Sequence, residues 1–214
     1  MPARLRPTAP IASDAVLVGD PGRALLLAQE LLAEPKMSNH ARGLWGYSGR
    51  TPAGDELTIQ STGMGGPSAA LVLADLAKLG VRRAVRVGTC VALDPKLKPG
   101  ELLVIGEAVG VATGRPEREL ATRLGKRLGG KGMGAGTGAR VASLDDPQAE
   151  PPAGVAATDM QTATLLSRAR ELGIAIAAIL IVERSARGER VADEALEDAA
   201  KRAGQAAAST LNLK

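Results

Sequence analysis

Three glycine-rich turns in this sequence carry the residue types that hold a small anion. Residues 19–23 (Gly-Asp-Pro-Gly-Arg), 62–68 (Thr-Gly-Met-Gly-Gly-Pro-Ser) and 86–89 (Arg-Val-Gly-Thr) each place glycines beside a hydroxyl group or an arginine. Backbone N–H groups in such turns, and guanidinium groups, bind phosphate well. One Gly-Asp-Pro-Gly alone more often marks an ordinary strand-to-helix turn. Three such turns together predict an anion site.

The three turns lie between segments with the patterns of strands and helices. Short apolar stretches predict strands, and apolar residues at helical spacing predict helices. We expect strands at 15–18, 44–48, 56–61, 81–87, 102–109 and 174–182, helices at 23–32, 63–79, 117–128 and 193–211, and a helix or strand–helix junction at 158–172. The strands 44–48 and 56–61 are expected to form a hairpin. This alternation favours an α/β fold, a single-domain, three-layer αβα arrangement around a central mixed, mostly parallel sheet.

Composition limits the classes of protein to which the chain belongs. Its 214 residues suffice for one hydrophobic core, so residues 1–214 are interpreted as one domain. The 27 basic and 23 acidic residues form no long basic run, so no nucleic-acid partner is expected. Cys90 is the only cysteine, which excludes an intrachain disulfide. The longest apolar run, 174–182, is too short to span a membrane, and residues 1–15 lack a signal-peptide core. We therefore expect a cytoplasmic protein without a membrane partner.

In order along the chain, four motifs resemble the successive signatures of the purine nucleoside and uridine phosphorylases. They are residues 19–23, 39–43 (Asn-His-Ala-Arg-Gly), 63–68 and 86–90 (Arg-Val-Gly-Thr-Cys). The resemblance resumes at 159–161 (Asp-Met-Gln) and 179–184, and it leaves out residues 111–152. It implies a phosphorylase-like fold and assembly as a homodimer or homohexamer. Residues 111–152 are interpreted as a shortened, mobile segment beside the base.

The resemblance implies a phosphate site made by the backbone of Gly19 and the side chains of Arg23, Arg86 and Thr89. It also implies that Arg42 reaches into the site of a neighbouring subunit. Phosphorolysis needs a phosphate dianion held against C1′ of a ribose while the glycosidic bond breaks, and guanidinium groups position such an anion. Inorganic phosphate is therefore expected as a co-substrate, without a cofactor or a metal.

The same resemblance assigns the sugar and the base. Met160 and Gln161 stand where the family contacts ribose, although the family has a glutamate at the position of Gln161. After the last buried strand, purine-cleaving members carry Ser-Asp and uridine phosphorylases carry Asn-Arg, whereas this chain has Glu183-Arg184. Arg184 is expected to stabilise negative charge on a pyrimidine oxygen. Gln148 is the one candidate amide for the base within 143–157.

The leading hypothesis is a nucleoside phosphorylase close to the uridine phosphorylases, with Arg86 and Arg184 as its catalytic residues. Such an enzyme is a pentosyltransferase. Its substrates are a nucleoside and inorganic phosphate, and its products are a free base and (deoxy)ribose 1-phosphate.

Two alternatives remain open. Gln161 in place of a glutamate, and Arg4 where the family has an amino-terminal histidine, suit a homologue that binds nucleoside or phosphate but has weakened catalysis. The second alternative is a nucleosidase, which uses water in place of phosphate. Nucleosidases on this fold carry a carboxylate where Arg184 stands and lack the full set of arginines, so Arg23, Arg42 and Arg86 argue against this alternative.

Overall fold

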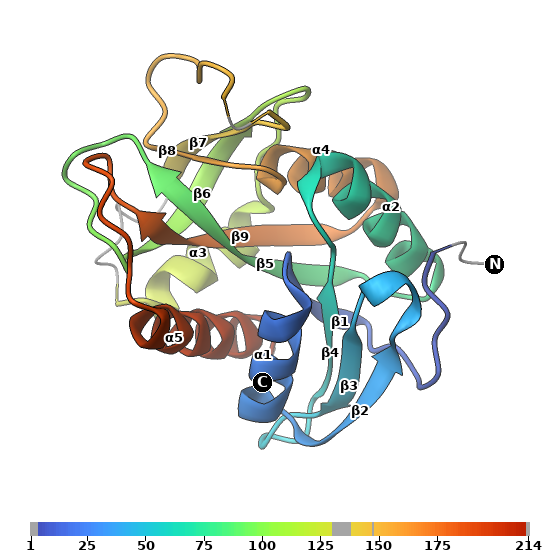
Figure 1. Cartoon of the computed structure of the whole chain (residues 1–214). Helices are drawn as coiled ribbons and strands as arrows, with labels where there is room; N and C mark the ends of the chain where they lie inside the picture. The colour runs from blue at the N-terminus through green and yellow to red at the C-terminus, as the bar shows by residue number, and fades with distance from the viewer. Residues whose placement is uncertain (1–3, 130–137, 147, 213–214) are drawn as a thin grey trace.

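The computed structural model describes residues 4–129, 138–146 and 148–212. Their strands and helices are, in chain order, β1 (Asp14–Val18), α1 (Pro21–Leu31), β2 (Ala33–Asn39), β3 (Gly46–Arg50), β4 (Glu56–Ser61), α2 (Gly65–Lys78), β5 (Arg83–Ala92), β6 (Leu102–Val109), α3 (Arg118–Arg127), β7 (Ala139–Ser143), β8 (Ala157–Asp159), α4 (Thr162–Leu172), β9 (Ala175–Arg184) and α5 (Asp193–Leu211). A short 3₁₀ turn, Ala41–Gly43, lies between β2 and β3. Figure 1 shows the strands at the centre of the molecule with helices on both sides.

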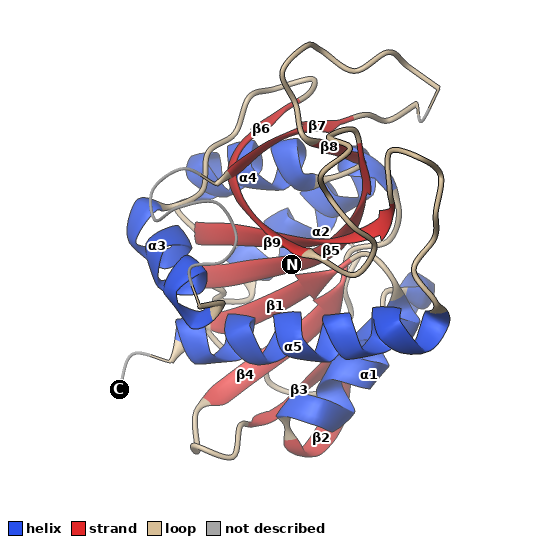
Figure 2. Cartoon of the chain, turned by 90° about the vertical axis from the view of Figure 1, so that its left-hand side faces the viewer, coloured by secondary structure: helices blue, strands red, loops and turns tan. Residues whose placement is uncertain are grey.

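The strands of the described residues form one sheet that closes on itself at one side. Its order is β2-β3-β4-β1-β5-β8-β7-β6-β9, and β9 also pairs with β5. The neighbours β4, β1, β5 and β9 are parallel, as are β6, β7 and β8. The β2–β3, β3–β4, β5–β8 and β6–β9 pairs are antiparallel. The predicted mixed, mostly parallel sheet is confirmed, whereas the ring of β5, β8, β7, β6 and β9, seen in Figure 2, is not foreseen by the sequence.

Helices cover both faces of the sheet. On one face α1, α3 and α5 pack around a cluster that includes Val16, Val18 and Ile179. On the other face α2 and α4 pack around a cluster that includes Leu17 and Leu180. Successive residues of a strand point to opposite faces, so the apolar strands β1 and β9 contribute to both layers. The predicted three-layer αβα arrangement is confirmed, as Figures 1 and 2 show.

Most elements lie where the sequence predicts them. The bounds of β4, β6 and α5 are those predicted, and β3 and β4 form the predicted antiparallel hairpin. β5 is longer than predicted, because it continues through Gly88 and Thr89 to Ala92, where it pairs with β8 and β9. None of the described helices is long and apolar enough to cross a membrane.

Two strands are missing from the sequence prediction. β2 has the polar sequence Ala-Glu-Pro-Lys-Met-Ser-Asn and forms an edge of the sheet, the position that tolerates its proline. β7 pairs with β6 on one side and β8 on the other, and four of its five residues are buried. β7 is therefore buried, against the expectation of a surface segment there, whereas the interpretation of 111–152 as a shortened, mobile segment beside the base stays a prediction. The glycine-rich stretch 129–138 lies almost entirely outside the described residues.

Candidate functional site

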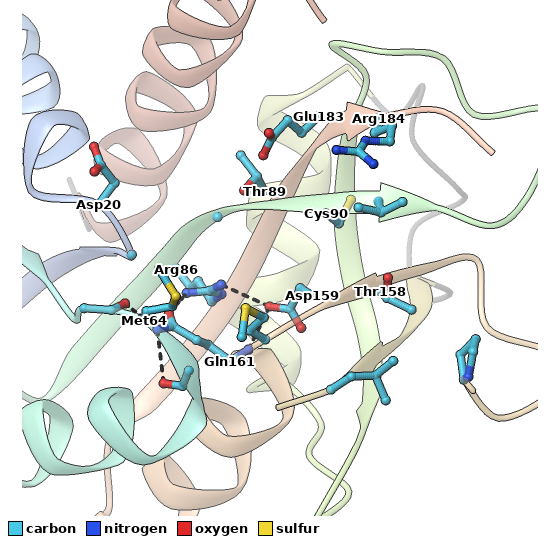
Figure 3. Close-up of a pocket in the computed structure, with 18 of the residues that line it drawn as sticks. Asp20, Met64, Arg86, Thr89, Cys90, Thr158, Asp159, Gln161, Glu183 and Arg184 are labelled. Carbon is cyan, nitrogen blue, oxygen red and sulfur yellow. Dashed lines mark hydrogen bonds and ion pairs between the residues drawn. The ribbon is translucent and has the colours of Figure 1, made fainter. Parts of the chain in front are cut away.

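A cavity of about 680 Å³ opens at the edge of the sheet where parallel strands end. The turns after β1 and β4, the second half of β5, the ends of β8 and β9 and a loop after β7 bound it. Parallel strands bring their carboxyl ends to one edge, and α/β sheets bind ligands there. The three glycine-rich turns singled out in the sequence meet in this cavity, with Gly19, Gly63 and Gly88 in its wall. Figure 3 shows the side chains around it.

Arg86 of β5 is a fixed, buried cation in the cavity wall. The residue is 4% exposed, and its side chain makes three hydrogen bonds. Nε donates to Thr162 Oγ1 (3.0 Å), Nη1 to Gln161 Oε1 (2.6 Å) and Nη2 to Asp159 Oδ2 (3.0 Å), the last also an ion pair. A guanidinium has five N–H groups, so two remain for a ligand. The structure thus holds the guanidinium in place without using all its donors.

Asp159, at the end of β8, anchors Arg86 to the start of α4. Its Oδ2 accepts from Arg86, from the Thr162 hydroxyl (2.6 Å) and from the backbone N–H groups of Thr162 (3.0 Å) and Gln161 (3.2 Å). Its Oδ1 accepts from the Ser143 hydroxyl (2.5 Å) at the end of β7. A carboxylate that accepts N–H groups at a helix start is stabilised by the orphan donors and by the helix dipole. Asp159 therefore fixes three elements around one cation.

Gln161 uses both ends of its amide within the protein. Its Oε1 accepts from Arg86 Nη1 (2.6 Å) and lies 3.0 Å from the Thr62 hydroxyl, which is also 3.0 Å from Val18 O. Its Nε2 donates to Gly63 O (2.6 Å) and Gly65 O (3.2 Å). The side chain is 3% exposed. The predicted contact of Gln161 with ribose stays a prediction, and it would require the amide to release one of these bonds.

Two glycines are required by close approach of other groups. A Cβ at Gly88 would lie 2.7 Å from Arg86 Nη2 and 2.8 Å from Leu180 Cδ2, so the guanidinium lies over the backbone of Gly88. Gly63 has φ +73°, in the left-handed region that favours glycine, and a Cβ there would lie 2.7 Å from Ser68 Oγ. Because neither glycine carries a Cβ, Arg86 can lie over the backbone of β5 and residues 62–65 can form a tight turn beside the cavity.

The other residues predicted to bind phosphate line the same cavity as Arg86. They are Gly19, Arg23 and Thr89. Arg23 lies in the first turn of α1, whose N-cap Asp20 accepts from the Arg23 backbone N–H (2.7 Å). Burial lowers the pKa of the Arg23 guanidinium; nearby Asp20 and Glu183 raise it, and Arg86 lowers it. No described residue forms a hydrogen bond or ion pair with this guanidinium. Its donors are therefore available to a ligand.

Of the further residues predicted to contact the base or the sugar, two line the cavity and one does not. Arg184 ends β9, is exposed and lines the cavity opposite its strand partner Val91. Met160 is half-buried and also lines the cavity. Gln148 is exposed and lies outside the cavity lining, although its neighbour Ala149 belongs to that lining. The structure therefore brings Arg184 and Met160 to the site, and the role of Gln148 stays a prediction.

Arg42 and Arg4 lie away from this cavity. Arg42 is exposed, has φ +59° and borders a separate hollow of about 450 Å³ together with Arg6, Thr8 and His40. Its predicted role in a neighbouring subunit needs a second copy of the chain and stays a prediction. The Arg4 backbone N–H donates to Asp75 Oδ2 (2.6 Å) on α2, so residue 4 is bound to its own chain.

Cys90 lines the cavity as a neutral thiol. Burial raises its pKa from 9.0 to about 12; Asp159 and Glu183 add to the rise and Arg86 opposes it. The thiolate is the nucleophilic form, so Cys90 is unsuited to covalent catalysis. Among the described residues, no group of three or more His, Cys, Asp or Glu side chains is arranged to hold a metal ion.

Several residues that hold the site together are not predicted from the sequence. Asp159 was visible only as part of a motif, and nothing near Ser143 or Thr162 in the sequence signals a bond to the site. Glu183 lines the cavity as well, and its Oε1 accepts from Arg190 Nη2 (2.9 Å). These contacts join residues that are far apart in the chain, so local patterns do not reveal them.

Comparison with known proteins gives sequence and structural relatives. A family model described as the phosphorylase superfamily matches residues 13–152. The DeoD-type purine nucleoside phosphorylase of Oceanobacillus iheyensis is 38% identical over 95 residues, which are 44% of this chain and 40% of that protein. The protein of the same name from Chromobacterium violaceum is 37% identical over 103 residues, 48% of this chain and 42% of that protein. The match thus spans less than half the length of these curated relatives.

A solved structure covers more of the chain. The crystal structure of uridine phosphorylase from Vibrio fischeri ES114 superposes with a TM-score of 0.80 at 21% sequence identity. The superposition covers 94% of this chain and 92% of the other. At this identity the likeness establishes the fold.

Proposed function

Because the chain belongs to the phosphorylase superfamily, we propose that it is a nucleoside phosphorylase. It cleaves the N-glycosidic bond of a nucleoside with inorganic phosphate and releases a free base and (deoxy)ribose 1-phosphate. The observation that carries this proposal is Arg86, a buried guanidinium with two free donors in a cavity at the carboxyl edge of the sheet. A buried cation that faces an open cavity is suited to an anionic ligand.

Phosphate binds between the two guanidinium groups of Arg86 and Arg23. The hydroxyl of Thr89 and the backbone N–H of Gly19 add neutral donors, and all four residues line the cavity. Charge-assisted bonds of this kind are stronger than neutral ones and orient the anion. The phosphate then faces C1′ of the sugar, where it attacks and where its charge stabilises the sugar cation that forms as the bond breaks.

The nucleoside occupies the rest of the cavity. Its ribose lies against Met160 and the Gln161 side of the wall, and its base lies toward Val91 and Arg184. The Arg184 guanidinium donates to the pyrimidine oxygen on which negative charge develops, which makes Arg184 catalytic together with Arg86. Gln148, on the loop that borders the cavity, supplies the amide that completes base recognition. The preferred substrate is accordingly a pyrimidine nucleoside.

The proposal includes a second copy of the chain. Arg42 lies outside the cavity of its own chain, and an exposed arginine in that place is free to contact the phosphate of a neighbour. A homodimer or homohexamer is therefore the proposed assembly, and the cytoplasm its proposed location.

A binding protein with weakened catalysis is the second candidate function. What favours it is the neutral Gln161, whose amide is already engaged on both sides. A neutral side chain gives no charge stabilisation to a sugar cation. Such a protein would bind phosphate and nucleoside without appreciable release of base.

Calorimetric titration with inorganic phosphate tests the proposed anion site. Arg86→Ala should weaken phosphate binding by about 100-fold, because it removes a buried, hydrogen-bonded charge. Arg83→Ala is the matched control, because Arg83 lies on the same strand but pairs with Asp14 away from the cavity. Equal phosphate affinity in Arg86→Ala and wild-type protein would overturn the proposed site.

A further inference from the structure

Gln161 joins two walls of the cavity that come from distant parts of the chain. On one side its Oε1 accepts from Arg86 Nη1 of β5 (2.6 Å). On the other side its Nε2 donates to the carbonyl oxygens of Gly63 (2.6 Å) and Gly65 (3.2 Å), in the turn after β4. Figure 3 shows Gln161 between Arg86 and this turn, with dashed lines to its partners. A single side chain therefore connects the cation to the glycine-rich turn.

The partners of Gln161 need both halves of an amide. Arg86 can only donate, and the two carbonyl groups can only accept. An amide matches both, whereas a carboxylate offers acceptors alone and would place an oxygen 2.6 Å from the Gly63 carbonyl oxygen. The side chain is 3% exposed, so water is not at hand to repair a mismatch. At this position a glutamate would break the connection on the turn side.

The turn that Gln161 holds has an unusual backbone. Gly63 and Gly65 have φ +73° and +78°, so both lie in the left-handed region, and both carbonyl groups turn toward the Gln161 amide. Gly19 lies against the same amide, because a Cβ added to it would be 3.7 Å from Gln161 Oε1. Gln161 thus contacts the turn after β4 and the cation on β5, and it lies near the turn after β1.

We propose that Gln161 is a positioning residue that holds Arg86 and the residues 62–65 turn in the arrangement that binds phosphate. This inference rests on the proposed phosphate site. The purine nucleoside and uridine phosphorylases that this sequence resembles carry a glutamate at this position, and it contacts ribose. In this chain the Gln161 amide binds Arg86, Gly63 and Gly65 of its own protein instead. Restoring a glutamate should therefore weaken the anion site and should not increase turnover.

Three variants separate this role from simple charge repulsion. Gln161→Glu adds a charge, and Gln161→Met removes the hydrogen bonds at similar size and without charge. Thr62→Val removes the hydroxyl that lies 3.0 Å from both Gln161 Oε1 and Val18 O. Gln29→Glu makes the same glutamine-to-glutamate change at an exposed position of α1 and is the control for Gln161→Glu. Phosphate affinity measured by calorimetry should fall about tenfold in both Gln161 variants. It should stay within about twofold of wild type in Gln29→Glu.

A double-mutant cycle makes the test independent of stability. Thr62→Val should lower phosphate affinity by about threefold in the wild type and have no further effect in Gln161→Met, because the Thr62 hydroxyl acts on Arg86 through Gln161 Oε1. Additive losses, or phosphate affinity in Gln161→Met equal to wild type, would overturn the inference. A large gain in turnover by Gln161→Glu would also overturn it, because that result identifies residue 161 as a ribose ligand.

The titration of Arg86→Ala distinguishes failure of this inference from failure of the proposed function. If Arg86→Ala loses phosphate binding while Gln161→Met keeps it, the anion site stands and the positioning role is wrong. If Arg86→Ala keeps phosphate binding, both the site and the role of Gln161 are overturned.

Discussion

At one end of the cavity Arg86, Asp159 and Gln161 are at most 7% exposed and are bound to one another, whereas at the other end Val91 and Leu93 are 40% and 38% exposed. Within the described residues, the Arg184 guanidinium at this second end also has no hydrogen-bond or ion-pair partner. Donors that are fixed before a ligand arrives bind an anion without reorganisation. We call the first end the proposed phosphate end and the second the proposed base end. If the proposed function holds, we expect this chain to specify phosphate more strictly than the base.

The largest effect expected from this comparison is on stability. Asp159→Ala leaves Arg86 buried without its counter-charge, which should lower the free energy of unfolding by about 3–5 kcal/mol. Asp14→Ala is the matched control, because Asp14 pairs with Arg83 of the same strand but that pair is partly exposed. It should cost about 1 kcal/mol. Urea unfolding measures both, and equal losses would mean that the phosphate end is no more tightly held than the rest of β5.

A smaller effect is expected from crowding the guanidinium. In Gly88→Ala the new Cβ would lie 2.7 Å from Arg86 Nη2, so the guanidinium must shift, and phosphate affinity should fall about tenfold. Gly125→Ala on α3 meets open space and should leave phosphate affinity unchanged. Calorimetry of the two variants side by side makes the measurement. If Gly88→Ala binds phosphate as the wild type does, the position of Arg86 is not critical.

The smallest effect should appear at the base end. Arg184→Ala should lower kcat/KM for a pyrimidine nucleoside by about threefold, because one charge-assisted bond to the base is lost at an exposed site. Phosphate affinity should not change, and Arg187→Ala, in the exposed loop that follows, should change neither value. Steady-state kinetics with phosphate and nucleoside varied separately would detect the difference. A drop in phosphate affinity in Arg184→Ala would contradict the division of the cavity into two ends.

Local chemistry made it partly predictable from the sequence which residues meet at the buried end of the cavity. Gly19, Gly63 and Gly88 mark turns after strands, and an arginine such as Arg86 within an apolar strand stands out from its surroundings. The layers of the fold follow from alternating strand and helix patterns for the same reason. These signals need no knowledge of which strands are neighbours.

The rest depends on contacts between distant segments. The pairing of β8 with β5 brings Asp159 to Arg86, and the pairing of β7 with β8 brings Ser143 to Asp159. No pattern within any of these segments encodes those pairings. The partners of the Gln161 side chain cannot be predicted from the sequence either, because a glutamine in a motif can hydrogen-bond to a ligand or to other residues of the protein. β2 was not predicted because an exposed edge strand needs few apolar residues, and so its sequence lacks the apolar pattern that marks a strand.

The most direct test of the proposed function is release of free base from a panel of pyrimidine and purine nucleosides, with and without inorganic phosphate, followed by chromatography. The proposal predicts release only when phosphate is present, with pyrimidine nucleosides cleaved most rapidly, and loss of that release in Arg86→Ala. Release at the same rate without phosphate would identify a nucleosidase, and phosphate binding without any release would identify a binding protein. Either result would contradict the proposed phosphorylase activity.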